Sequence, residues 1–172
     1  MSASFAHVAL AKAKAIQQVV DEAWAPPAEG TTPRTEMVLL SSLTKGTRDY
    51  IEKIVNQING TYEHGWYDAC AVMIRRLVET LIIEAFEHHG VAHLIKDSSG
   101  NFLYLSKLIS ETLSYHHWNL SRNTKSSLPK LKDIGDKSAH SRRFICHRGD
   151  IDKIMPDLRV VVQELVYLSG LK

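Results

Sequence analysis

Apolar residues recur at intervals of three and four along most of this 172-residue chain, and this spacing constrains its fold more than any other feature. Such spacing places apolar side chains on one face of an α-helix. The pattern is strongest over residues 62–89. Its central stripe consists of Cys70, Ile74, Leu77, Leu81 and Ala85. Further apolar residues widen this stripe, so we expect the segment to be a central helix that packs against several neighbours.

Weaker patterns of the same period predict five more helices, at residues 3–24, 44–59, 101–114, 128–140 and 150–169. Asn59-Gly60 and Gly90 are the expected helix stops, and Phe102 is expected to face inward. Pro156 should lie in the first turn of the last helix or kink it. Because no alternation of period two persists, the chain is predicted to be all-α, an antiparallel bundle of about five or six helices.

Two prolines, Pro26-Pro27, end the first predicted helix, and residues 26–34 are rich in Pro, Gly and Thr. We therefore expect two parts, residues 1–34 with a helix and linker, and residues 35–172 with the bundle. The first helix is either a detachable arm or dimerisation element, or a helix packed on its own domain.

Composition excludes several classes of protein. With 44% hydrophobic residues the chain can form a core without disulfides, and only two cysteines occur. No apolar run approaches the roughly 20 residues that span a membrane, and the N-terminus lacks the features of a signal peptide. No glycine-rich phosphate loop, nucleophile elbow or dinucleotide fingerprint is present. We expect a cytoplasmic protein without a cofactor.

The net charge is only +2, but it is unevenly spread. Residues 119–148 hold eight Lys or Arg against two Asp, which makes that window +6 and leaves −4 for the rest. Such asymmetry indicates either a basic face for phosphates or a solvated face without a partner. The cations that we assign to nucleic-acid binding are Lys137, Arg142 and Arg143.

Metal and thiol chemistry are weakly supported. His89 and His93 have the i, i+4 spacing of a metal pair, but Gly90 interrupts the helix and no carboxylate pattern accompanies them. Cys146 beside His147 could form an activated thiol, but no third orienting group is identified. We predict no metal site.

Charged residues interrupt the apolar face of the central helix. Arg75 and Glu79 stand at i and i+4, next to Arg76. They form either a local ion pair on the helix surface or a buried pair that braces the core. We predict a structural role for Arg75 and Glu79.

The most distinctive segment contains Lys132, Gly135, Asp136 and His140. Gly135 inside a helix costs about 1 kcal/mol relative to alanine, which is tolerable where another helix or a phosphate comes close. The other three residues share one helical face. They could supply a cation, an orienting carboxylate and an imidazole for acid–base attack on RNA. Alternatively, Asp136 and His140 hydrogen-bond the next helix, and the residues alone favour this structural role.

Residues 67–79 and 131–140 resemble two motifs of the HEPN superfamily. The first is similar to its central helix, an Ala-rich stretch leading into an Arg and a Leu-x-Glu, and the second to its late helix with a polar residue and a His. The resemblance covers about residues 45–170. It implies a bundle of four or five helices that is often dimeric. In its active members an Arg and a His cleave RNA without metal.

Within that resemblance, His140 matches the motif His and Asp136 takes the position usually filled by Asn. The motif Arg would fall at positions 133 to 135, where this chain has Asp133, Ile134 and Gly135. Lys132 lies one position too far. We therefore predict a non-catalytic module that dimerises and binds nucleic acid or protein, in a defence or toxin system. The alternative is a metal-independent ribonuclease with His140 as acid/base, Asp136 orienting it and Lys132 on the phosphate.

Overall fold

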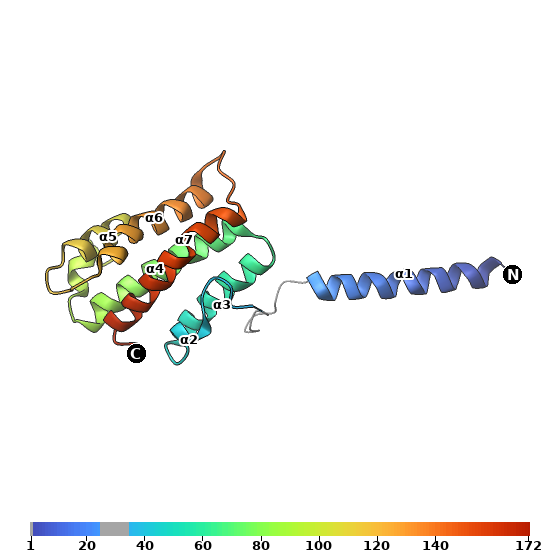
Figure 1. The fold of residues 1–172 in the computed structure, drawn as a ribbon, viewed down its shortest axis with the longest axis horizontal. Coiled ribbons are helices and arrows are strands. Elements are labelled where there is room, and N and C mark those ends of the chain that lie inside the picture. Colours follow the sequence, from blue (N-terminus) through green and yellow to red (C-terminus); the bar gives the residue numbers. More distant parts are fainter. Residues whose placement is uncertain (1, 25–34) are drawn as a thin grey trace. The chain divides into compact units, whose positions relative to one another are not determined.

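The structure is a computed structural model that describes residues 2–24 and 35–172, with side chains of the first helix described over residues 6–20. In these residues there are seven α-helices, one short 3₁₀ helix and no strand (Figure 1). The all-α class predicted from the sequence is confirmed. None of the described helices is long and apolar enough to cross a membrane. The linker expected at residues 26–34 lies outside the described residues.

The chain divides into two units, Met1–Thr31 and Thr32–Lys172. The first unit contains α1 (Ser2–Trp24), whose side chains are exposed over residues 6–20. The second unit contains α2 (Ser41–Thr44), α3 (Asp49–Glu63), α4 (Tyr67–His88), the 3₁₀ helix η1 (Ala92–Ile95), α5 (Leu105–Ser114), α6 (Arg122–His140) and α7 (Arg148–Leu168).

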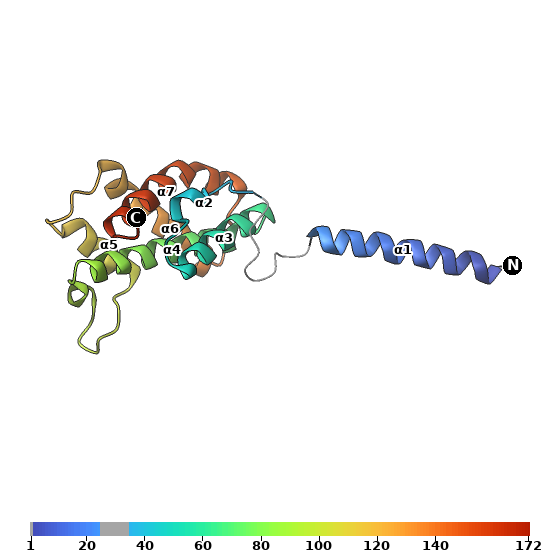
Figure 2. The same cartoon turned by 90° about the horizontal axis from the view of Figure 1, so that it is seen from below.

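Helix α4 is the central helix of the second unit. It packs against α3, α6 and α7, while α3 runs antiparallel to α4 and α6 runs antiparallel to α7 (Figures 1 and 2). All five residues of the predicted stripe are fully buried, namely Cys70, Ile74, Leu77, Leu81 and Ala85. The prediction of a broad, buried central helix is confirmed, but the helix begins at Tyr67 and not near residue 62, which belongs to α3. Gly90 follows its end in the left-handed conformation, with φ of 70°.

The second predicted helix was misplaced at both ends. It begins at Asp49 and continues through Asn59-Gly60 to Glu63. The side-chain amide of Asn59 has long-range partners. Its Oδ1 accepts hydrogen bonds from the backbone N–H groups of Val38 and Leu39 at 3.1 and 3.0 Å. Asn59 therefore holds the preceding segment on α3 and does not stop the helix. The turn falls at Gly65, with φ of 76°.

The polar residues 122–127, expected outside a helix, are the first turns of α6. Ser121 caps this helix, since its Oγ accepts a hydrogen bond from Thr124 N at 3.1 Å. Glu164 of α7 in turn accepts from Ser121 N at 2.6 Å and from Ser121 Oγ at 2.8 Å. The start of α6 is thus set by a contact between distant parts of the chain, which its polar composition concealed.

Helix α5 begins at Leu105 and not near 101, because Asp97 organises a turn that competes with the helix. Its Oδ1 accepts hydrogen bonds from Ser99 N and Asn101 N. Phe102 pairs with Lys96 in an isolated antiparallel bridge and is 40% exposed, so the expected inward position of Phe102 is wrong. Of the two alternatives for Pro156, the first-turn position is wrong, since Pro156 lies inside α7 and beyond its first turn.

Candidate functional site

Gly135 marks the closest approach between α4 and α6. A Cβ atom built at this position would lie 2.5 Å from Arg75 Cβ and 3.0 Å from the backbone oxygen of Ala71. Real Cβ atoms do not come so close to other heavy atoms, so any side chain here would push the two helices apart. The glycine that the sequence placed inside a helical pattern therefore lies against a neighbouring helix and not in open space.

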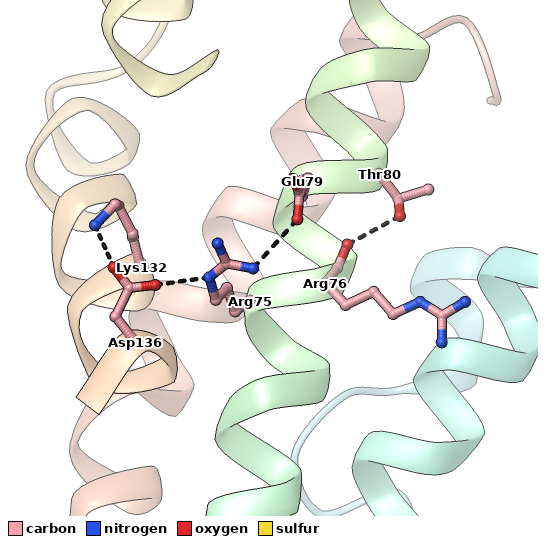
Figure 3. A network of polar contacts seen from close by, with 6 residues as sticks. All are labelled: Arg75, Arg76, Glu79, Thr80, Lys132 and Asp136. Carbon is pink, nitrogen blue, oxygen red and sulfur yellow. Dashed lines mark hydrogen bonds and ion pairs between the residues drawn. The ribbon is translucent and has the colours of Figure 1, made fainter. Parts of the chain in front are cut away.

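Beside this contact, a chain of ion pairs joins the same two helices (Figure 3). Arg75 Nε of α4 donates to Asp136 Oδ1 of α6 at 2.7 Å. Arg75 Nη1 also lies 3.3 Å from Glu79 Oε2, and Lys132 pairs with the second oxygen of Asp136. The four side chains are 27 to 31% exposed. We call these four residues the interhelix network.

The electrostatics of Asp136 follow from this arrangement. Partial burial raises the pKa of Asp136, but the hydrogen bonds from Lys132 and Arg75 outweigh it, so that the pKa lies below its ordinary value of 3.8. Asp136 is therefore a carboxylate held between two cations. Such a group braces a helix pair well and is a poor proton acceptor.

His140, the predicted acid/base, stands apart from the network. It is the last residue of α6 and its side chain is exposed. Within residues 35–172, no hydrogen bond or ion pair links Asp136 to His140, and both Asp136 oxygens already have cationic partners. Of the three residues predicted to act together, the structure joins Lys132 with Asp136 and leaves His140 outside. The partner that sequence reasoning missed is Arg75, which lies 61 positions away.

A strongly basic stretch begins where the network ends. Residues 137–148, which we call the basic segment, contain four Lys or Arg and two His but no Asp or Glu. Arg142 and Arg143 are exposed, and their guanidinium groups have no hydrogen-bond or ion-pair partner within the described residues. The third predicted phosphate ligand, Lys137, is exposed too but pairs with Asp133 of the preceding turn at 2.6 Å.

The basic segment is firmly attached to the bundle although its charged side chains face solvent. Cys146 N donates to Asp68 Oδ1 at the start of α4 at 3.0 Å, and the Cys146 side chain is buried. Ser141 Oγ accepts from the backbone N–H groups of Arg143 and Phe144 at 3.4 and 3.2 Å. The two free arginines are thus presented from a connection whose backbone is held in place.

A hollow of about 270 Å³ lies between α6 and α7 beside this segment. Its polar lining consists of Lys130, Lys137, Lys153, Asp133 and Asp150. Asp133 is engaged by Lys137, and Asp150 accepts from the backbone of His147 at the start of α7. Lys130 pairs with Asp157 at 3.4 Å, so Lys153 is the lining cation without an acidic partner in the described residues. The hollow is therefore lined by mixed charges.

The other chemical alternatives find little support. Burial raises the pKa of Cys146 to about 11 and that of Cys70 to about 12, so neither thiol resembles an activated nucleophile. No group of three or more His, Cys, Asp or Glu side chains that could hold a metal ion is found in the described part of the chain. His89 instead donates from Nε2 to the backbone oxygen of Leu168 at 3.0 Å.

Comparisons with family models, with curated proteins and with solved structures find no match to this chain. The resemblance to the HEPN superfamily therefore stays a prediction, and function has to be argued from the site itself.

Proposed function

We propose that this chain is a non-catalytic, HEPN-like helical module that binds nucleic acid through the basic segment and dimerises, in a cytoplasmic defence system. The observation that carries the binding proposal is the pair of exposed arginines, Arg142 and Arg143, without acidic partners on a fixed connection. Unpaired guanidinium groups suit phosphate oxygens because they donate in a planar fork. A held backbone lowers the entropy lost on binding.

The geometry supports binding over catalysis. A general base needs a proton-accepting group and a partner that orients it. Here the carboxylate expected to orient His140 is committed to Arg75 and Lys132. The same pairing removes Lys132 as a free phosphate ligand. The absence of the motif arginine from positions 133 to 135 also supports a binding surface over a cleavage site.

The direct test is binding of a fluorescently labelled 12-nucleotide oligouridylate, followed by anisotropy between 50 and 300 mM salt. We expect affinity to fall steeply with salt, with a logarithmic slope of about −0.7 for each phosphate contacted. Absence of binding at the lowest salt concentration would refute the proposal.

Ribonuclease activity is the second candidate, favoured by the exposure of His140 next to the basic segment. Incubation of labelled RNA with the protein in EDTA, for wild type and His140→Ala, distinguishes the two functions. We expect no cleavage by either protein. Cleavage by the wild type that the substitution abolishes would make the chain a metal-independent nuclease.

Self-association is supported by α1 taken by itself. Ala15, Ile16, Val19 and Val20 line an apolar hollow on this helix, and Ile16 and Val19 are each 66% exposed. Exposed apolar patches commonly mark protein contacts. We expect light scattering to report a dimer that Ile16→Glu dissociates. A cytoplasmic location fits the two free cysteines, because thiols stay reduced there.

A further inference from the structure

An exposed aromatic pair lies on the turn between α3 and α4. Trp66 is 46% exposed, and its ring lies 5.2 Å from that of His64, with an angle of 34° between the planes. The turn is fixed, since Trp66 N donates to Thr61 O at 2.8 Å and His64 Nδ1 donates to Gly60 O at 2.8 Å. The indole therefore faces solvent from a fixed position with a second ring behind it.

Trp66 differs in exposure from Trp118, the other tryptophan whose side chain the structure describes. Trp118, by contrast, is 6% exposed and packs against Phe86 and Tyr115, with ring centroids 4.5 and 4.9 Å away. That tryptophan is a core residue. Trp66 is not a core residue in this sense, because about half of its surface is exposed and open to a ligand.

Trp66 lies at the same end of the bundle as the basic segment. Two residues after it, Asp68 holds the backbone of Cys146 at 3.0 Å. Before the turn, the hydroxyl of Tyr62 accepts from Arg148 Nε at 3.1 Å. Both views place the α3–α4 turn and the α6–α7 connection at this one end (Figures 1 and 2). The exposed indole and the basic segment thus lie at one end of the bundle and are linked there by these two contacts.

We propose that Trp66, backed by His64, is a stacking platform for an unpaired base of a single-stranded polynucleotide whose phosphates follow the basic segment. This inference rests on the nucleic-acid binding proposed above and names the form of nucleic acid. Every base offers a flat face to an indole, whereas a duplex hides these faces inside its own stack. A surface that combines cations with an exposed aromatic ring should therefore prefer single strands over duplexes, without a preference for sequence.

The test compares wild type, Trp66→Ala and Trp66→Phe on labelled 12-mers of uridylate and thymidylate, on an RNA duplex, and on an abasic 12-mer of equal charge. For the 12-mer with bases, we expect Trp66→Ala to weaken binding about tenfold and Trp66→Phe to retain most of the affinity. Binding to the abasic strand and to the duplex should be weaker for wild type and unaffected by either substitution.

Trp66-dependent binding in either the ribose or the deoxyribose arm supports the platform, and the stronger arm identifies the natural sugar. Equal affinity of Trp66→Ala and wild type for the base-bearing strands overturns it. So does an equal loss on the abasic strand, which would indicate a structural defect. If no strand binds to wild type, the proposed function itself fails, whereas binding that ignores Trp66 sinks only the stacking inference.

Discussion

The interhelix network lies close in sequence to Arg142 and Arg143 of the basic segment, yet its cations and these two arginines are used in opposite ways. In the network, Arg75 and Lys132 are half-buried and share one carboxylate, Asp136. In the basic segment, Lys137 and Arg148 pair with Asp133 and Asp152, whereas Arg142 and Arg143 are exposed and have no acidic partner within the described residues. Cations that already have partners inside the protein hold it together, and cations left without partners are available to a ligand. Along α6 and the connection after it, the cation with a structural role, Lys132, therefore precedes Lys137, and the cations available to a ligand, Arg142 and Arg143, follow it.

The largest loss of stability is expected from a substitution at the contact between α4 and α6, beside the interhelix network. We expect Gly135→Ala to destabilise the bundle by about 2 to 3 kcal/mol, because the new methyl group would meet Arg75 Cβ at 2.5 Å. Thermal unfolding followed by circular dichroism measures the loss. Binding of RNA at 10 °C, where the variant stays folded, should be close to that of wild type.

Gly149→Ala is the matched control, since a Cβ at Gly149 would have no neighbour within 4 Å. This residue lies in the first turn of α7, so alanine there should be neutral or slightly stabilising. Equal melting temperatures for the two alanine variants would mean that α4 and α6 do not pack through Gly135.

The second largest effect should come from the network itself. Arg75→Met keeps most of the side-chain volume but removes the link to Asp136 and Glu79, and we expect a loss of about 1 to 2 kcal/mol in urea unfolding. Arg76→Met is the control, because Arg76 is exposed and its guanidinium has no partner among the side chains of Figure 3. A similar loss in both variants would argue against the network.

The ion pairs of Asp136 with Arg75 and Lys132 should make part of the stability of the protein sensitive to acid. The pKa of Asp136 lies below its ordinary value of 3.8 in the folded protein. Its contribution is therefore complete above that ordinary value and disappears as the pH falls through the lower, folded-state pKa. We expect the stability gap between wild type and Asp136→Asn to be widest near pH 7 and to narrow towards pH 2. A gap that is constant across this range would contradict the ion pairs.

The ion pairs within a single helix could be predicted from the sequence more easily than the contacts between helices. The pairs Arg75–Glu79 and Lys132–Asp136 are visible from an i, i+4 spacing, because both partners belong to one helix. The link that joins them, Arg75 to Asp136, spans 61 positions and depends on how two helices pack. Sharing a face with Asp136 likewise did not bring His140 into contact, since two cations had taken both carboxylate oxygens.

The fold likewise has features that could be predicted from the sequence and features that could not. The apolar period predicted the central helix and its stripe, since burial follows directly from spacing. It predicted the end of α6 at His140 but not its start or the limits of α3. The continuation of α3 past Asn59 and the start of α6 depend on partners of Asn59 and Glu164 at least 20 positions away. The anchoring of Cys146 by Asp68 spans 78 positions, so the held backbone of the basic segment could not be predicted either.

On the functional side, the largest expected effect belongs to the two free arginines. Arg142→Gln combined with Arg143→Gln should weaken oligouridylate binding about tenfold at low salt and reduce the salt slope by about 1.4, while the melting temperature stays unchanged. The matched control is Lys107→Gln combined with Lys125→Gln, which removes two other exposed cations, on α5 and in the first turn of α6. If both double variants bind equally weakly, net charge and not the basic segment accounts for affinity.

The smallest expected effect tests whether Lys137 can be changed from a paired cation into one that is available to a ligand. Asp133→Asn removes the partner of Lys137, an exposed i, i+4 pair at 2.6 Å, and should cost only about 0.3 kcal/mol of stability. Lys137, the first residue of the basic segment, then has no acidic partner, so binding should strengthen about threefold at low salt, with a slope steeper by up to about 0.7. Asp49→Asn is the control, because it frees Lys53 from an equivalent pair at the start of α3 and changes net charge equally. A gain for Asp133→Asn alone would show that pairing decides which cations serve the ligand, whereas equal gains, or none, would remove Lys137 from the interface.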